Sequence, residues 1–143
     1  GRILSIDYGR KRTGLAVTDP LKLIAGGLAT VSTHELFDYL INYVEREPVE
    51  LVVIGEPKQP NGQPSENLER VRQFVNRWRK QVPQIPIEFY DERFTSVLAH
   101  KAMLDGGLGR KARQDKSLVD EISATIILED YMRSRMYLDK NNT

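Results

Sequence analysis

The sequence lacks cysteine, contains only two histidines, and has no apolar run long enough to cross a bilayer. Without cysteine there is no disulfide framework, no thiolate metal site and no thiol nucleophile. The histidines, His34 and His100, have no partner at metal-ligand spacing, so we treat them as ordinary residues. The apolar stretch 3–6 is interrupted at once by Asp7 and then by cations, which is unlike a secretory signal peptide. We therefore expect a cytoplasmic protein with no membrane partner.

The length and composition of the chain fit one globular domain. A chain of 143 residues, 40% apolar and 29% charged, can bury roughly two-thirds of its unfolded surface. No internal repeat or linker divides it. We expect a single domain over residues 1–138 and a frayed polar tail at residues 139–143.

The net charge of +1 is too close to neutral to indicate a nucleic-acid partner by itself, but the cations are clustered. Two clusters have a context that favours contact with phosphate, and they consist of Arg10, Lys11 and Arg12, and of Arg110, Lys111, Arg113 and Lys116. A third cluster loads one predicted helix and is explained equally well as a solvated face: Arg70, Arg72, Arg77, Arg79 and Lys80.

Short apolar runs bounded by glycine, proline and polar residues predict strands at 3–7, 14–18, 28–31, 51–54 and 87–90. Apolar residues at helical spacing predict helices after Thr33, from about residue 68, after Thr95 and after Ser117. A hairpin followed by alternating strands and helices indicates an α/β fold, with a mixed five-stranded sheet and helices packed on it.

Acids or glycine lie at the carboxyl ends of three of the predicted strands, at Asp7, Gly55 and the pair Asp91–Glu92. Because sheets of this kind bind ligands at the carboxyl ends of their parallel strands, we expect these residues to form a site. Acids that converge there would be costly without a cation, so convergence would imply a metal ion. Asp7 could instead accept backbone hydrogen bonds in a turn before Gly9. Gly55 would let the backbone approach a substrate closely.

The later acids are open to more than one interpretation. Asp91 and Glu92 are adjacent, so on a strand their side chains point to opposite faces and only one can enter a shared site. The phase of the strand alone does not choose between them, and Arg93 could pair with one of them. Asp120 lies three residues after Ser117, which is the spacing of a capping box. It could also complete a metal site from the first turn of a helix that faces the strand ends.

Four motifs follow one another along the chain. They are Asp7-Tyr-Gly9-Arg-Lys11-Arg12-Thr-Gly14, Gly55-x-Pro57 with Gly62, Asp91-Glu92-Arg93-Phe-Thr95, and Asp120 at the start of a helix carrying the apolar segment 124–128. Each is weak alone, but the four together span nearly the whole chain, which resembles the YqgF family, also called the RuvX or pre-16S rRNA nuclease family. The chain departs from the family in its middle loop, where Glu56 stands in place of a commonly apolar residue and Gln59-Pro60 is unusual.

That resemblance implies a ribonuclease-H-like fold, similar to RuvC-type Holliday-junction resolvases. It implies a metal-dependent endonuclease that processes the 5′ end of the 16S rRNA precursor, with junction resolution as an older alternative. The acidic site would consist of Asp7, the pair Asp91–Glu92 and Asp120, with Glu92 favoured within the pair. Mg²⁺ or Mn²⁺ would bind to Asp7, Glu92 and Asp120, since these metals prefer carboxylate and water ligands.

The nucleic acid, pre-rRNA or branched DNA, would be held mainly through its backbone. The contacts are expected from Gly55 and from the cations Arg10, Lys11, Arg12, Arg93, Arg110, Lys111, Arg113 and Lys116. Pre-ribosomal particles are a further expected partner, and the oligomeric state is left open by the sequence.

Two other functions are compatible with parts of the sequence. A non-catalytic RNA-binding assembly factor could use the same fold, because fold does not fix activity. An actin-like kinase or ATPase also begins with Asp-x-Gly after a strand. That class needs two such domains and a second phosphate motif, and this chain has neither.

Overall fold

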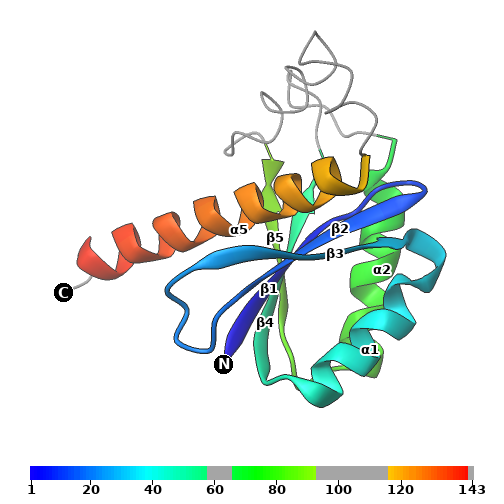
Figure 1. The fold of residues 1–143 in the computed structure, drawn as a ribbon. Helices are drawn as coiled ribbons and strands as arrows, with labels where there is room; N and C mark the ends of the chain where they lie inside the picture. Colours follow the sequence, from blue (N-terminus) through cyan, green and yellow to red (C-terminus); the bar gives the residue numbers. More distant parts are fainter. Residues whose placement is uncertain (58–65, 93–115, 142–143) are drawn as a thin grey trace, which may run out of the picture.

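A five-stranded mixed sheet, ordered β3-β2-β1-β4-β5, organises the computed structural model (Figure 1). The structure describes residues 1–57, 66–92 and 116–141, with the side chains of residues 116–119 and 136–141 excepted. The strands are β1 (Arg2–Asp7), β2 (Arg12–Thr18), β3 (Ala25–Ser32), β4 (Val49–Glu56) and β5 (Ile87–Asp91). The helical elements are the 3-10 turn η1 (Thr33–Glu35), α1 (Leu36–Arg46), α2 (Leu68–Gln81) and α5 (Lys116–Asn141).

The pairing of the strands follows from the lengths of their connections. Short turns join β1, β2 and β3, which form an antiparallel meander in which Asp7 pairs with Gly14. The longer connections through α1 and α2 place β4 parallel to β1 and β5 parallel to β4. The carboxyl ends of β1, β4 and β5 therefore meet at one edge of the sheet. The predicted α/β fold with a mixed five-stranded sheet is confirmed.

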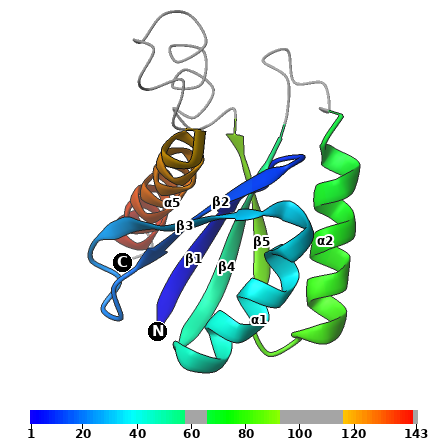
Figure 2. The ribbon, with the colours of Figure 1, turned by 45° about the vertical axis from the view of Figure 1, so that its right-hand side comes forward.

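Helices cover both faces of the sheet (Figure 2). On one face, α1 and α2 bury apolar residues at helical spacing, including Leu36 and Leu40 of α1 and Val71, Val75 and Trp78 of α2. These side chains belong to the larger core cluster, and the indole of Trp78 donates a hydrogen bond to the carbonyl of Ile85 at 2.9 Å. This face therefore contains the larger hydrophobic core of the described residues.

The other face is covered by α5, which approaches the sheet closely because small residues lie between them. Ala16 of β2 and Ala124 of α5 are both fully buried there. The hydroxyl of Ser5 on β1 donates a hydrogen bond to the carbonyl of Ala124 at 2.6 Å. Farther along α5, Ile127 packs with Val53 of β4. None of the described helices is long and apolar enough to span a bilayer.

Several element boundaries differ from the predictions. All five strands are longer than predicted, because their ends pair in the sheet despite weaker apolar character. The prediction that Thr33 caps a helix is wrong: Thr33 opens the 3-10 turn, and its hydroxyl bonds to the carbonyl of Gly9 instead. The predicted cap at Ser117 is also wrong, because α5 already begins at Lys116. The helix predicted after Thr95 lies outside the described residues, and α5 continues past residue 138 to Asn141.

The phenol of Tyr131 on α5 gives a test of this packing. Its hydroxyl donates to the Glu88 carboxylate at 2.9 Å, and burial together with this hydrogen bond raises the pKa of Tyr131 to about 12. The folded protein therefore keeps the phenol proton at pH values where the unfolded chain, with its ordinary pKa of 10.0, has lost it. The free energy of unfolding consequently falls as the pH rises from 10.0 to about 12. We expect Tyr131→Phe to lose about 1 kcal/mol at neutral pH.

The variant should also lose less stability than the wild type as the pH rises from about 10 to about 12. Urea unfolding followed by Trp78 fluorescence measures both effects. Identical pH dependence of the two proteins would contradict the assignment.

Candidate active site

Asp7 ends β1 at the carboxyl edge of the sheet and is buried, with 6% of its surface exposed. Side chains alternate along a strand, so Asp7 lies on the same face as Ser5, which bonds to α5. Its partner in β2 is Gly14. The predicted strand-end position of Asp7 is thereby confirmed, and it faces α5.

Gly14 allows the first described turns of α5 to rest directly on β2. A Cβ atom added at Gly14 would lie 1.9 Å from the carbonyl oxygen of Asp120 and 3.0 Å from its Cβ. Asp120 therefore lies over the residue that pairs with Asp7. Its carboxylate forms a partly exposed ion pair with Arg12, whose Nε atom lies 3.1 Å from Oδ2.

Glu92 directly follows β5 and is also buried, with 5% of its surface exposed. A Cβ atom added at Gly55 would lie 2.8 Å from Oε1 of Glu92 and 2.9 Å from Cδ1 of Ile127 in α5. The carboxylate of Glu92 therefore lies above Gly55, on the face that α5 covers. Gly55 leaves room for this carboxylate, a role that differs from the close approach to substrate that the sequence suggested.

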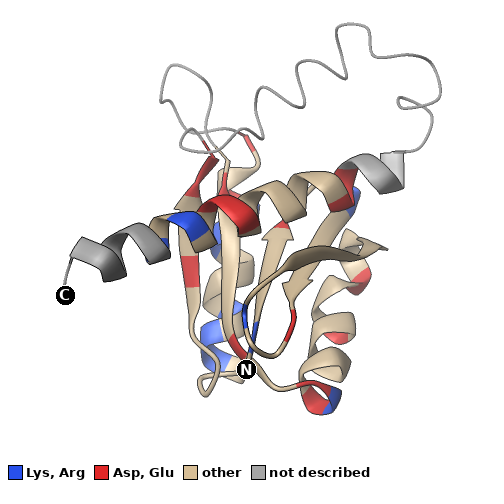
Figure 3. Cartoon of the chain, turned by 60° about the vertical axis from the view of Figure 1, so that its left-hand side comes forward, with Lys and Arg blue, Asp and Glu red and all other residues tan. Residues whose placement is uncertain are grey.

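Asp91 belongs to the opposite face. Ile87 and Phe89 of the same strand pack in the core beneath α1 and α2, and Asp91 continues their alternation. The two neighbouring acids therefore lie on opposite faces of the sheet. Asp7, Glu92 and Asp120 lie on the α5 face, over three adjacent strands, and Asp91 does not. Figure 3 shows acidic residues at the strand ends from which the undescribed segments leave.

The chemistry of these donors fits a hard divalent cation, although the three carboxylates do not form a closed cage. Within residues 1–57, 66–92 and 116–141, no three Asp, Glu, His or Cys side chains are close enough to hold a metal ion together. Asp120 is engaged with Arg12 in this arrangement. Mg²⁺ commonly uses one or two carboxylates and takes its remaining ligands from water and substrate phosphates. Asp7 at the end of β1 and Glu92 directly after β5 have the oxygen donors that this mode of binding uses.

The cationic turn between β1 and β2 is fixed beside these acids. A Cβ atom on Gly9 would lie 2.1 Å from the carbonyl oxygen of Arg12, so the turn can close tightly only with glycine there. Thr33 stabilises the turn through two hydrogen bonds. Its hydroxyl donates to the Gly9 carbonyl at 2.7 Å, and its amide donates to the Lys11 carbonyl at 2.9 Å. Arg10 and Lys11 are exposed on this turn.

The other predicted contacts to nucleic acid are not placed. Arg93, Arg110, Lys111 and Arg113 lie outside the described residues, and Lys116 opens α5 without a described side chain. Sequence reasoning missed the supporting parts of the site, namely Gly14, Thr33 and Asn67. The amide nitrogen of Asn67 donates to the Tyr8 carbonyl at 2.8 Å. Only Gly14 carried a usable signal, because a glycine inside an apolar strand often marks close approach of another segment.

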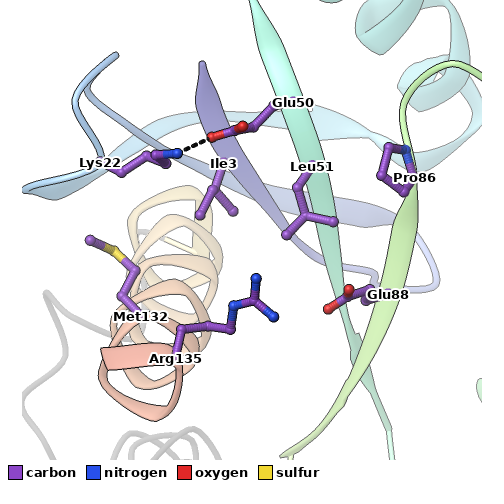
Figure 4. A pocket seen from close by; sticks show the side chains of 8 residues that line it. All are labelled: Ile3, Lys22, Glu50, Leu51, Pro86, Glu88, Met132 and Arg135. Atoms are coloured by element: carbon purple, nitrogen blue, oxygen red, sulfur yellow. Dashed lines mark ion pairs between the residues drawn. The ribbon is translucent and has the colours of Figure 1, made fainter. Parts of the chain in front are cut away.

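A separate cavity of about 440 Å³ lies at the other end of the sheet (Figure 4). It is lined by residues near the starts of β1, β4 and β5, including Ile3, Leu51 and Glu88, and by Met132 of α5. Within its lining, Lys22 pairs with Glu50, and the Glu88 carboxylate accepts a hydrogen bond from Tyr131. Because it opens at the amino ends of the strands, this cavity is distinct from the acidic site.

A family model described as RuvX, Holliday junction resolvase, matches residues 1–134. The chain belongs to the RuvX family. Its RuvX relatives include a protein of Phocaeicola vulgatus, 64% identical over 137 residues, with 96% of this chain and 99% of that protein covered. Another is from Flavobacterium johnsoniae, 54% identical over 136 residues, with 95% and 99% covered. Both bear the name "Putative pre-16S rRNA nuclease".

Two solved structures share the fold of this RuvX chain. The resolvase of Fowlpox virus, solved with Holliday junction DNA, superposes with a TM-score of 0.55 at 14% identity, covering 94% of this chain and 98% of the resolvase. RuvC of Thermus thermophilus gives a TM-score of 0.53 at 15% identity, with 94% and 96% covered. The predicted ribonuclease-H-like fold is thereby confirmed.

The contact at Gly14 can be tested by adding one methyl group. We expect Gly14→Ala to lower the free energy of unfolding by about 1–3 kcal/mol, because its Cβ would overlap the backbone of Asp120. Gly26→Ala on β3 is the matched control, since a Cβ there meets nothing within 4 Å, and it should change stability by less than about 0.5 kcal/mol. Urea denaturation measures both, and equal stability of the two variants would refute the close contact.

Proposed function

We propose that this RuvX-family protein is a metal-dependent endonuclease that acts on structured nucleic acid, with the 5′ end of pre-16S rRNA as its substrate. One observation carries the proposal: Asp7, Glu92 and Asp120 come from distant parts of the sequence to one face and one edge of the sheet. Two of these carboxylates are almost fully buried, and burial of like charges is costly unless a cation or hydrogen bonds offset it. In a metal-dependent phosphodiesterase, such carboxylates bind the metal ion.

In the proposed mechanism the chain supplies positions and charges. Asp7 and Glu92 would hold Mg²⁺ or Mn²⁺, with Asp120 as a further ligand. When bound, the ion would supply Lewis-acid stabilisation and a more acidic water. Arg10 and Lys11 on the fixed turn would orient the backbone phosphate. Arg12 would keep Asp120 in place, since the two already form an ion pair.

The choice of substrate rests on the relatives. Their name supports pre-16S rRNA, and a pre-rRNA substrate would place the protein in the cytoplasm, in contact with pre-ribosomal particles. The description of the matching family model supports a Holliday-junction resolvase as the second candidate. A non-catalytic assembly factor would bind RNA through the same cations without needing the acids.

The role of Asp7 is tested by Asp7→Asn, which keeps the shape of the side chain and removes its charge. We expect cleavage of an RNA spanning the 16S precursor 5′ boundary to slow by at least about a hundredfold, or about 2.7 kcal/mol of transition-state stabilisation. Asp91→Asn is the control, because Asp91 lies on the other face. It should cleave within about threefold of the wild type.

A four-way DNA junction assayed in parallel separates the two candidate substrates. Unfolding followed by Trp78 fluorescence should show that both variants fold. Unchanged cleavage by pure Asp7→Asn protein would rule out this site. Binding of the RNA by both the wild type and Asp7→Asn, with cleavage by neither, would favour the assembly factor.

Metal binding has a readout that does not depend on activity. Mg²⁺ or Mn²⁺ at about a hundred times its Kd should stabilise the wild type by about 2.7 kcal/mol, visible as a higher melting temperature. Asp7→Asn and Glu92→Gln should lose most of this shift, whereas Asp91→Asn should keep it. Chelation by EDTA should abolish both the shift and cleavage. A shift of the same size in all four proteins would place the metal elsewhere.

A further inference from the structure

Two cavities lie on the side of the sheet that faces α1 and α2, away from the acidic face, and they share Arg70. One, of about 310 Å³, is lined by Arg10, Glu66, Asn67 and Arg70. The other, of about 300 Å³, adjoins the start of α1. Its lining residues include Tyr8, His34, Phe37, Arg70, Phe74 and Arg77. Because both are lined by Arg70, we treat them as one groove, named here the α2 groove.

The α2 groove follows one stripe of a helix. Arg70, Gln73, Phe74 and Arg77 of α2 are spaced i, i+3, i+4 and i+7, so they lie on the same side of that helix. Arg70 and Arg77 are about 10 Å apart along the axis, at 1.5 Å per residue. Two contacts with a single extended ligand could therefore be made from this stripe.

The groove is built next to the acidic site. The Asn67 amide at the start of α2 bonds to the Tyr8 carbonyl at 2.8 Å, and the rings of Tyr8 and Phe74 are 5.9 Å apart. In Figure 2 the tip between β1 and β2 lies beside the first turn of α2. Tyr8 directly follows Asp7 but packs against the opposite core. The turn carrying Arg10 thus separates the groove from the carboxylates.

Arg70 and Arg77 are placed so that they can contact an anionic ligand that contains planar rings. The guanidinium carbon of Arg77 lies 3.8 Å from the centroid of the Phe37 ring, so its planar group is stacked and pre-oriented. Burial raises the pKa of Tyr8, and the positive charge of Arg70 acts against that rise, which places Arg70 near the phenol. Among the described residues neither arginine forms a salt bridge. Their charges are thus available to a ligand.

Cations beside aromatic faces are typical of sites for single-stranded nucleic acid. Guanidinium groups bind phosphates, and bases stack on aromatic rings or on arginine planes. The remaining cations of α2 differ from Arg70 and Arg77. Arg72 and Lys80 do not line either cavity, and Arg79 donates to the carbonyl of Ile87 at 3.3 Å. Those cations are explained as a solvated face, whereas Arg70 and Arg77 also line a cavity beside aromatic rings.

We infer that the α2 groove binds single-stranded RNA, namely the segment of the substrate that passes around the Arg10 turn from the acidic site. This inference rests on the proposed nuclease function for the identity of the strand. Arg70 and Arg77 contact its phosphates, and Tyr8 and the stacked Arg77 plane contact its bases. The groove holds the flanking strand and takes no part in the bond cleavage.

The test uses Arg70→Gln/Arg77→Gln, with Arg72→Gln as a matched control, since Arg72 is exposed on the same helix. Binding of a fluorescent single-stranded RNA is measured by anisotropy in EDTA, so that no cleavage occurs. We expect the double variant to bind at least about tenfold more weakly, and the slope of log K against log salt to become shallower by about 1.4, at about 0.7 per phosphate contact. Arg70→Gln alone, which leaves Arg77 on Phe37, should change the slope by about 0.7.

Arg72→Gln should bind within about twofold of the wild type, and Trp78 fluorescence should confirm that each variant is folded. The inference is overturned if the double variant binds like the wild type, or if Arg72→Gln weakens binding as much as the double variant does. Failure of the nuclease proposal is distinguishable. If Asp7→Asn loses cleavage and the double variant binds RNA as the wild type does, only the proposal for the α2 groove is ruled out. Weakened binding by the double variant, with unchanged cleavage by Asp7→Asn, removes the acidic-site assignment and leaves the groove as an RNA site.

Discussion

The close contact of α5 with β2 and β1 is the constraint on which the rest of the site depends. Gly14 accepts the backbone of Asp120 where a methyl group would overlap it, and the hydroxyl of Ser5 bonds to the carbonyl of Ala124. These two contacts fix both the height and the position of the helix above the sheet. Asp120 then lies over the partner of Asp7. A larger residue at either interface would lift the third carboxylate away from the strand ends.

The two faces of the sheet have different tasks. The face beneath α1 and α2 contains the larger core, with Trp78 fully buried. The face beneath α5 contains small residues and carboxylates, and it is joined to the helix partly by polar contacts. Neighbouring residues serve the two faces in turn, as Asp7 precedes Tyr8 and Asp91 precedes Glu92. The larger apolar core and the candidate acidic site therefore lie on opposite faces of the same strands.

Much of the fold was predictable because strong local patterns encode it. The apolar runs before Asp7 and Gly55 predicted the strands and placed both residues at one edge. The family resemblance favoured Glu92 over Asp91, but the strand pattern alone did not choose between them, because the choice depends on the phase in which β5 enters the sheet. The partner of Asp120 was also hidden, since Arg12 lies 108 residues away in sequence. The α2 groove likewise joins three segments whose proximity no local pattern reveals.

The bond between Ser5 and Ala124 joins residues 119 positions apart, which has a consequence for how the protein forms. The strands of the meander can pair early, because their contacts are local. The acidic edge is complete only when α5 has been synthesised and has docked, because α5 carries Asp120 and the residue Ala124 that packs on Ala16. During translation the nascent chain therefore has one exposed apolar face and an unfinished site. Docking of α5 on the sheet and assembly of the three carboxylates at one edge are therefore a single event.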